Sequence, residues 1–355
     1  MRDERELGRV IGRGVQTVAP PSDLLAGVTR RRRRRARRQM VFTAAAVVMV
    51  VAGSSLAFWR EAPRVGVQPV PSVDQQWPEA VVKLPVSSAD GKKYRPVAAL
   101  GATRILVAVE SGVRRIERLE IFDTVTRSFR VLGTTPQATT ARFEVGASSV
   151  AWSGPGGELW VMPLSGGTAR RVGTARGEVG ALSVTPTHLV WSHALTGVYR
   201  VPLDGGKTEE ISDSLRLQAW PWAVSFVDGN PAMLHDLESG RRIKIDTASS
   251  SHVRCVPRWC IGLRSGALAV WRPDGSGLRF LAGSNKIGDI LDGRFAISHP
   301  PRESVVLDLE SGRTGVIRAS SDFGLGWSYS TPTVVYWGRE AGDQEFSLLN
   351  LLAVR

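Results

Sequence analysis

Short runs of Val, Ile, Leu, Trp and Tyr fill the chain from about residue 80 to its end, and Gly, Asp, Ser and Pro interrupt them. Apolar and polar positions partly alternate within these runs, as in residues 159–162 (LWVM) and 198–201 (VYRV). Such runs are typical of β-strands, and the Ser-Gly-Gly and Asp-Gly-Gly steps between them supply the positive φ angles that tight hairpins need. Because no stretch after residue 80 keeps a helical period with caps, we expect an all-β domain.

One long apolar segment departs from this pattern. Residues 40–59 (MVFTAAAVVMVVAGSSLAFW) contain no charged side chain, and as a helix they would span roughly 30 Å, the thickness of a bilayer's hydrocarbon core. They predict one transmembrane helix, with Phe58 and Trp59 at the outer headgroup level. The alternative is a signal peptide cleaved near Ser55-Leu56-Ala57, although the 39 residues before the segment are long for a signal.

A run of arginines directly precedes the apolar segment, namely Arg30, Arg31, Arg32, Arg33, Arg34, Arg35, Arg37 and Arg38. Arginines at one end of a span stay on the cytoplasmic side, so we expect a cytoplasmic amino terminus and an extracytoplasmic carboxyl-terminal domain. We interpret the run as a topology determinant that also contacts anionic lipid, at about 1 kcal/mol per basic residue near the surface. A docking site for a cytoplasmic protein is the alternative.

The strand-rich part of the chain repeats itself. Residues 150–153 (VAWS) return 39 positions later as 189–192 (LVWS), and residues 163–167 (PLSGG) return at the same offset as 202–206 (PLDGG). Residues 236–241 (DLESGR) reappear unchanged 72 positions later, which is two units of 36. Strands at this density with a repeat of 35 to 40 residues predict the four-stranded blades of a β-propeller.

Dividing residues 93–355 by a unit of about 38 predicts a propeller of about seven four-stranded blades, with six as the alternative. The ring needs one strand from the amino-terminal side to complete its last blade, because an open ring would leave unpaired edges. Residues 80–85 (AVVKLP) are the candidate. Two β-sandwiches with chance similarity are the competing interpretation. The boundaries that we expect between blades follow residues 134, 177, 215, 251, 286 and 321.

The units at residues 159–172 (LWVMPLSGGTARRV) and 198–211 (VYRVPLDGGKTEEI) resemble the repeats of TolB-like, WD40-like bacterial propellers. The likeness extends loosely from about Trp77 to the end of the chain. It implies an exported propeller that binds proteins or small ligands. This chain departs from TolB itself, because it has a predicted span and linker where TolB has a further domain, and it lacks the WD dipeptide.

These observations divide the chain into four parts. Residues 1–39 form a basic cytoplasmic tail, residues 40–59 the transmembrane helix, residues 60–77 an extended linker and residues 78–355 the extracytoplasmic propeller. The linker is assigned because it is rich in Pro and Val and has no helical period.

The positive charge of the chain is concentrated before the predicted span. Of the net charge of +13, residues 1–39 carry 12 Arg against four acids, and the remaining 34 basic and 29 acidic groups nearly balance. We therefore expect no nucleic-acid binding by the folded domain.

Cys255 and Cys260 are the only cysteines. They flank a short segment that contains a Pro, and an exported domain meets oxidising conditions. They predict a disulfide across a hairpin rather than free thiols or a metal site.

The sequence offers no catalytic motif. It contains no G-x-S-x-G elbow and no phosphate-binding loop, and its five histidines lie at spacings unsuited to a metal. We therefore expect no catalytic residue, cofactor or metal ligand. Most tryptophans fall inside strand patterns and are expected in blade cores, but Trp220 and Trp222 flank a Pro and are candidates for a binding rim.

The residues before the span, about 18–38, resemble the juxtamembrane tails of actinobacterial membrane proteins whose genes often neighbour a sigma factor. The leading hypothesis is a membrane-tethered, extracytoplasmic propeller that binds a protein partner or a small ligand and acts as a scaffold or envelope sensor. The alternative is a propeller hydrolase or lyase acting on envelope sugars or peptides.

Overall fold

The computed structural model describes residues 70–355, apart from 113–114, 137, 139–141, 196, 282–287, 301–302, 319–322, 327–331 and 339–342. The chain divides into two compact units, 1–67 and 68–355. All described residues belong to the second unit. The expected cytoplasmic tail, the arginine run and the segment 40–59 lie outside them. Within the described part of the chain, no helix combines the length and the apolar character that a bilayer crossing requires.

The described unit consists of seven antiparallel four-stranded sheets, which we number as blades 1 to 7 in chain order. Blade 1 comprises β2 (Tyr94–Ala99), β3 (Arg104–Gly112), β4 (Arg115–Asp123) and β5 (Ser128–Thr134), and blade 2 comprises β6 (Phe143–Val145), β7 (Ser149–Ser153), β8 (Glu158–Pro163) and β9 (Arg170–Thr174). Blade 3 comprises β10 (Val179–Val184), β11 (His188–His193), β12 (Val198–Pro202) and β13 (Glu209–Ser212), and blade 4 comprises β14 (Arg216–Ala219), β15 (Trp222–Val227), β16 (Asn230–Asp236) and β17 (Arg242–Lys244).

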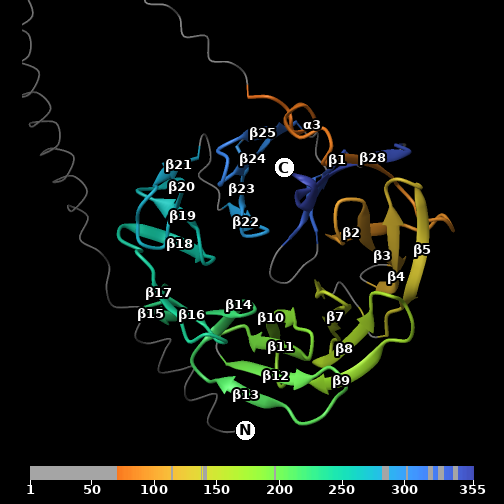
Figure 1. Cartoon of the computed structure of the whole chain (residues 1–355), viewed down its shortest axis with the longest axis horizontal. Helices are drawn as coiled ribbons and strands as arrows, with labels where there is room; N and C mark the ends of the chain where they lie inside the picture. Colours follow the sequence, from red (N-terminus) through yellow and green to blue (C-terminus); the bar gives the residue numbers. More distant parts are fainter. Residues whose placement is uncertain are drawn as a thin grey trace, which may run out of the picture. The chain divides into compact units, whose positions relative to one another are not determined.

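Blade 5 comprises β18 (Ser250–Cys255), β19 (Cys260–Arg264), β20 (Ala267–Trp271) and β21 (Arg279–Phe280), and blade 6 comprises β22 (Asp289–Leu291), β23 (Phe295–Ser298), β24 (Ser304–Asp308) and β25 (Thr314–Ile317). Blade 7 comprises β26 (Phe323–Leu325), β27 (Val334–Trp337), β28 (Glu345–Asn350) and β1 (Val81–Pro85). Figure 1 shows the blades following one another around a ring.

Strand β1 closes the ring by pairing with β28, so that Val81 lies opposite Leu349 and Pro85 opposite Glu345. The prediction of seven blades closed by residues 80–85 is therefore confirmed, and the six-blade and sandwich alternatives are wrong. The expected boundary between blades 4 and 5 differs slightly, because β18 already begins at Ser250.

The repeats at residues 163–167 and 202–206, and at 236–241 and 308–313, are turns that follow the third strands of their blades, whereas residues 150–153 and 189–192 lie in the second strands β7 and β11. In blade 4, the Asp236 Oδ1 atom accepts hydrogen bonds from the N–H groups of Glu238 and Ser239, at 3.0 and 3.1 Å. In blade 6, the Asp308 Oδ1 atom accepts from the N–H of Glu310 at 3.0 Å. A side-chain oxygen that satisfies its own turn explains why Asp recurs at this place. The repeat of residues 236–241 at 308–313 is thus explained by the hydrogen bonds that the turn needs.

Each junction between neighbouring blades holds its own apolar cluster, which accounts for seven clusters around the ring. Trp152, Trp191 and Trp271 are at most 1 % exposed within these clusters, as the strand pattern predicted. Two further tryptophans expected in the core, Trp160 and Trp337, are partly buried against it.

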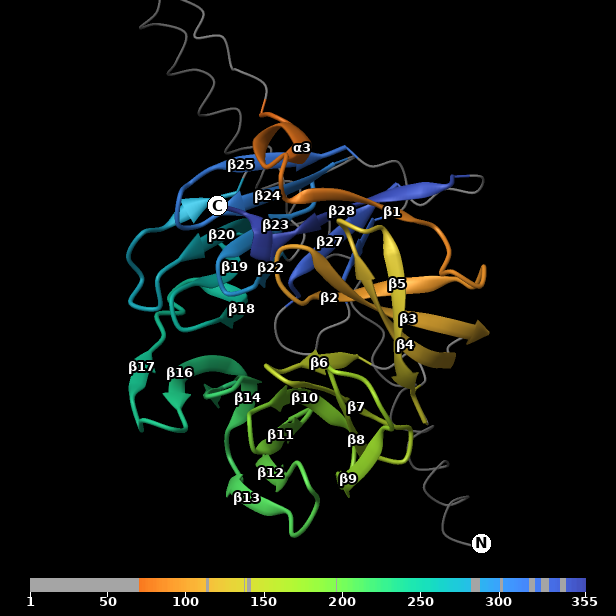
Figure 2. The same cartoon turned by 45° about the vertical axis from the view of Figure 1, so that its right-hand side comes forward.

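The last residues of the expected linker belong to the folded unit. A one-turn helix, α3 (Val73–Gln76), precedes β1, and the N–H of Val316 in β25 donates to the carbonyl of Pro71 at 2.9 Å. Figure 2 shows α3 beside β25. Val73 and Trp77 are 1 % and 4 % exposed, because one helical turn places both on the face that covers blades 6 and 7. Residues 60–69 lie outside the described residues.

Candidate functional site

A cavity of about 690 Å³ opens on the face formed by the turns after the first and third strands, where blades 1 and 2 meet blade 7. We call it the ring-closure cavity. Its walls come from three blades and are formed by Ala98, Ala99, Leu100, Arg104, Ile121, Arg130, Glu144, Val145, Gly146, Ala147, Ser148, Leu164, Ser165, Thr333 and Leu352. A volume of this size suits a small molecule or a few residues of a peptide.

Hydrogen bonds join the walls from blades 7 and 1. The N–H of Ala99 donates to the Thr333 hydroxyl at 2.9 Å. The Asn350 side-chain amide donates to the carbonyls of Gly101 and Ala102, at 2.8 and 3.0 Å. Asn350 is 1 % exposed, and buried side-chain hydrogen bonds of this kind fix a geometry. The blade that β1 completes therefore holds one side of the cavity in place.

The opposite wall is joined through blades 1 and 2. The guanidinium of Arg130 donates to the carbonyls of Ser165 and Leu164, at 3.2 and 3.4 Å. The N–H of Gly167 donates to the carbonyl of Leu132 at 3.0 Å. A Cβ atom on Gly133 would lie 2.4 Å from the Gly167 carbonyl oxygen. The turn of blade 2 can approach blade 1 this closely only because residue 133 is glycine.

Three charged residues line the cavity. Arg104 and Arg130 are exposed, whereas Glu144 on the inner strand β6 is only 7 % exposed. Arg104 lies opposite Asp123 in the register of β3 and β4. The N–H groups of Thr126 and Val125 hold the pKa of Asp123 below its ordinary value, and the charge of Arg104 contributes less. The N–H groups of Val125 and Thr126 both donate to the Oδ1 atom of Asp123, at 2.9 Å, and the Arg104 side chain is exposed beside this turn.

The predicted binding rim lies elsewhere on the ring. Trp220 and Trp222 are partly buried against two different apolar clusters, at the junctions of blade 4 with blades 3 and 5. The indole N–H of Trp220 donates to the Glu238 carboxylate at 2.9 Å. Neither tryptophan lines the ring-closure cavity. The cavity residues themselves were not identified from the sequence. The one available signal is that the turn of blade 2, residues 146–148, is built from small residues.

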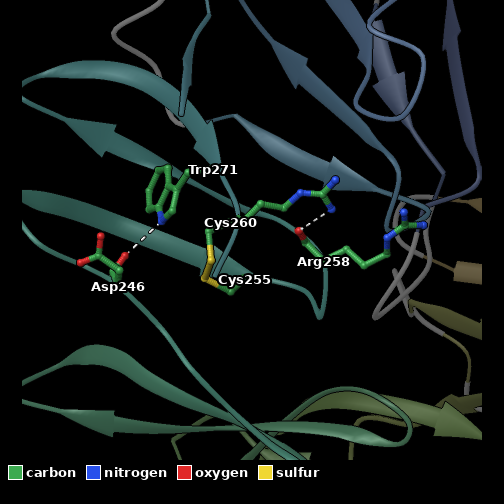
Figure 3. The surroundings of a disulfide bond; sticks show 6 residues. Asp246, Cys255, Arg258, Cys260 and Trp271 are labelled. Atoms are coloured by element: carbon green, nitrogen blue, oxygen red, sulfur yellow. Dashed lines mark hydrogen bonds between the residues drawn. A yellow bond between two sulfur atoms is a disulfide. The ribbon is translucent and has the colours of Figure 1, made fainter. Parts of the chain in front are cut away.

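Cys255 and Cys260 form the predicted disulfide. They are opposite each other in the register of β18 and β19, so the bond closes the hairpin that carries Arg258 and Trp259. Figure 3 shows the disulfide near Trp271, whose indole N–H donates to the carbonyl of Asp246 at 3.0 Å. The disulfide is buried and remote from the cavity walls.

Among the described residues, no group of three or more His, Cys, Asp or Glu side chains is arranged to hold a metal ion.

The comparisons with known proteins add little beyond the fold. No protein-family model matches the chain, and no curated protein matches it.

Solved structures of low sequence identity resemble the propeller. An oligogalacturonate lyase from Vibrio parahaemolyticus is 10 % identical, with 76 % of this chain and 97 % of that chain aligned at a TM-score of 0.49. A TolB from Agrobacterium tumefaciens is 18 % identical, with 65 % and 96 % aligned and a TM-score of 0.42. BamB from Moraxella catarrhalis is 10 % identical, with 73 % and 86 % aligned and a TM-score of 0.41. At these values, none of the likenesses bears on activity.

Proposed function

We propose that this chain is a membrane-tethered, extracytoplasmic propeller that binds a partner or ligand in the ring-closure cavity. The observation that carries the proposal is the cavity itself, whose three blades are joined by specific hydrogen bonds and whose surface combines leucines, hydroxyls and two arginines. A largely preformed concave site with a few polar groups is typical of ligand recognition.

The tethered placement rests on the apolar segment 40–59 and on the arginines before it. An alkaline phosphatase fused after Arg355 should be active in intact cells, and a fluorescent protein fused at the same place should stay dark if it is exported unfolded. The reverse result would overturn the placement. Detection of the mature chain without residues 1–57 would favour secretion after signal cleavage.

Binding in the cavity can be tested with two matched tryptophans. Ser148 and Thr187 occupy equivalent exposed turns of blades 2 and 3, and their carbonyls accept from the N–H groups of Leu164 and Leu203, at 2.8 and 2.9 Å. Only Ser148 lines the cavity. Ser148→Trp therefore fills the cavity, while Thr187→Trp makes the same change outside it.

The readout is a photoreactive amino acid placed at Leu352, which lines the cavity and is 43 % exposed, in full-length protein in intact cells. We expect a discrete adduct that Ser148→Trp abolishes and Thr187→Trp leaves unchanged. The same photoreactive group at Leu195, which is 82 % exposed in blade 3, should give no such adduct. An adduct that persists in Ser148→Trp would contradict binding in the cavity.

Transmission of binding to the tail is a further part of this proposal. It rests on the basic residues directly before the predicted span. Replacing residues 1–38 while supplying another anchor should change transcription if the tail signals to a sigma factor. An unchanged transcriptome would restrict the protein to a scaffold role.

A further inference from the structure

The ring-closure cavity carries an electrostatic preference. Arg104 and Arg130 are both exposed on it, and their guanidinium groups stay charged at any physiological pH. Arg130 is also oriented, because it donates to the carbonyls of Ser165 and Leu164. The single lining carboxylate, Glu144, is 7 % exposed and offers little surface to a ligand. On the cavity wall, an incoming carboxylate therefore meets two exposed cations and one shielded anion, with the Asp123 carboxylate opposite Arg104 on the neighbouring strand.

The apolar part of the cavity is aliphatic. Leu100, Leu164 and Leu352 line it without being fully buried, and Leu352 exposes 43 % of its surface. An exposed leucine inside a concave surface gains contact when an aliphatic ligand group covers it. The cavity thus offers a place for an aliphatic side chain beside its two arginines.

The aliphatic lining suits a peptide side chain, which packs against leucine without needing an aromatic surface. The hydroxyls of Ser148 and Ser165, both exposed on the wall, can bond to a peptide backbone.

We propose that the ring-closure cavity recognises an acidic peptide segment in which an aliphatic side chain neighbours a Glu or Asp carboxylate. This specificity rests on the proposed binding function. The aliphatic side chain contacts the three leucines, and the carboxylate accepts hydrogen bonds from Arg104 and Arg130. Charge-assisted hydrogen bonds to guanidinium are stronger than neutral ones and select for the carboxylate.

The probes for a test are three fluorescent peptides capped at both ends, Gly-Leu-Glu-Gly, Gly-Leu-Gln-Gly and Gly-Leu-Lys-Gly, titrated with the detergent-solubilised full-length chain. We expect the Glu peptide to bind about tenfold more tightly than the Gln peptide, which loses a charged hydrogen bond. Ser148→Trp should abolish binding of the Glu peptide, and Thr187→Trp should not.

Charge reversal supplies the second arm of the test. Arg104→Glu should remove the preference for the Glu peptide and favour the Lys peptide. Arg242→Glu makes the same charge change on an exposed residue of blade 4 and should leave the preference intact. Circular dichroism of each variant confirms that it is folded.

Two outcomes would overturn the specificity while leaving the binding function standing. The first outcome is equal affinity for the three peptides, although the Leu352 adduct still forms in the wild type and is still lost in Ser148→Trp. The other is tight, Ser148→Trp-sensitive binding of trigalacturonate, an acidic sugar, with no binding of the peptides. If the Leu352 adduct is absent as well, the proposed function itself fails.

Discussion

Two junctions between neighbouring blades differ in how their turn ends are packed. Between blades 5 and 6, Trp259 is 2 % exposed, the guanidinium of Arg272 lies 3.7 Å from the centre of its indole ring, and Arg254 pairs with Asp289 at 3.1 Å. Between blades 1 and 2, the turn end is left open as the ring-closure cavity. At the turn end, an indole fills the first junction, whereas the second junction buries its tryptophan, Trp152, within the strands and leaves the turn end open. The comparison shows that the two junctions have similar buried cores and differ at the turn end.

Replacing the central side chain of the filled junction should cause the largest loss of stability. Trp259→Ala deletes a buried indole from the cluster between blades 5 and 6, and we expect a loss of about 3–5 kcal/mol in the free energy of unfolding. Urea unfolding measures it. Trp220→Ala, which removes a half-buried indole and its bond to Glu238, should cost clearly less. Equal losses would show that the ring does not depend on the filled junction.

The open junction should depend on close backbone approach instead. In Gly133→Ala, the new methyl carbon would lie 2.4 Å from the Gly167 carbonyl oxygen, and displacing that turn should cost about 1–3 kcal/mol. Gly173 is the matched control, because it precedes the closing Thr of β9 as Gly133 precedes that of β5, yet its nearest neighbour would be 3.7 Å away. Gly173→Ala should stay within about 0.5 kcal/mol of the wild type.

The contrast between the junctions also marks what could be predicted from the sequence. The blade count could be predicted because strand and turn sequences return at a regular spacing, as in residues 236–241 and their copy at 308–313, where an Asp accepts hydrogen bonds from its own turn. The cavity was not readable, because Leu100, Leu164 and Leu352 come from three blades and meet only when the ring closes. Helix α3 was missed because four residues show no period.

Blade 6 contains a buried acid, Asp308 in β24, that should make the stability of the propeller depend on pH. Burial tends to raise the pKa of Asp308, but hydrogen bonds from Arg294 and Ser311 outweigh it and hold the pKa at about 2, below the ordinary value of 3.8. A lowered pKa stabilises the folded state at pH values above 3.8, by about 2 kcal/mol, and this stabilisation is lost as the pH falls towards 2.

Asp308→Asn tests this contribution. The variant should unfold more easily than the wild type by about 2 kcal/mol at pH 6, and the difference should shrink at pH 2.5. Asp236→Asn changes the copy of the same turn in blade 4, where the acid lacks the two bonds that Arg294 gives to Asp308, at 2.9 and 2.6 Å, and should show a smaller dependence. If the wild type were more stable than Asp308→Asn by the same free energy at both pH values, Asp308 would not be the source of the pH dependence.

The disulfide that closes the hairpin carrying Trp259 should have the smallest effect on stability. Cys255 and Cys260 close a loop of only six residues, and the entropy that such a loop removes from the unfolded chain corresponds to roughly 2 kcal/mol at most. Reducing agent should therefore lower the stability of the wild type modestly in urea, and a variant with both cysteines replaced by alanine should not respond to it. Because the bond lies remote from the ring-closure cavity, the Leu352 adduct should survive the double replacement. Loss of the adduct would mean that the hairpin of blade 5 and the ring-closure cavity are coupled around the ring, so that the propeller would respond as one cooperative unit.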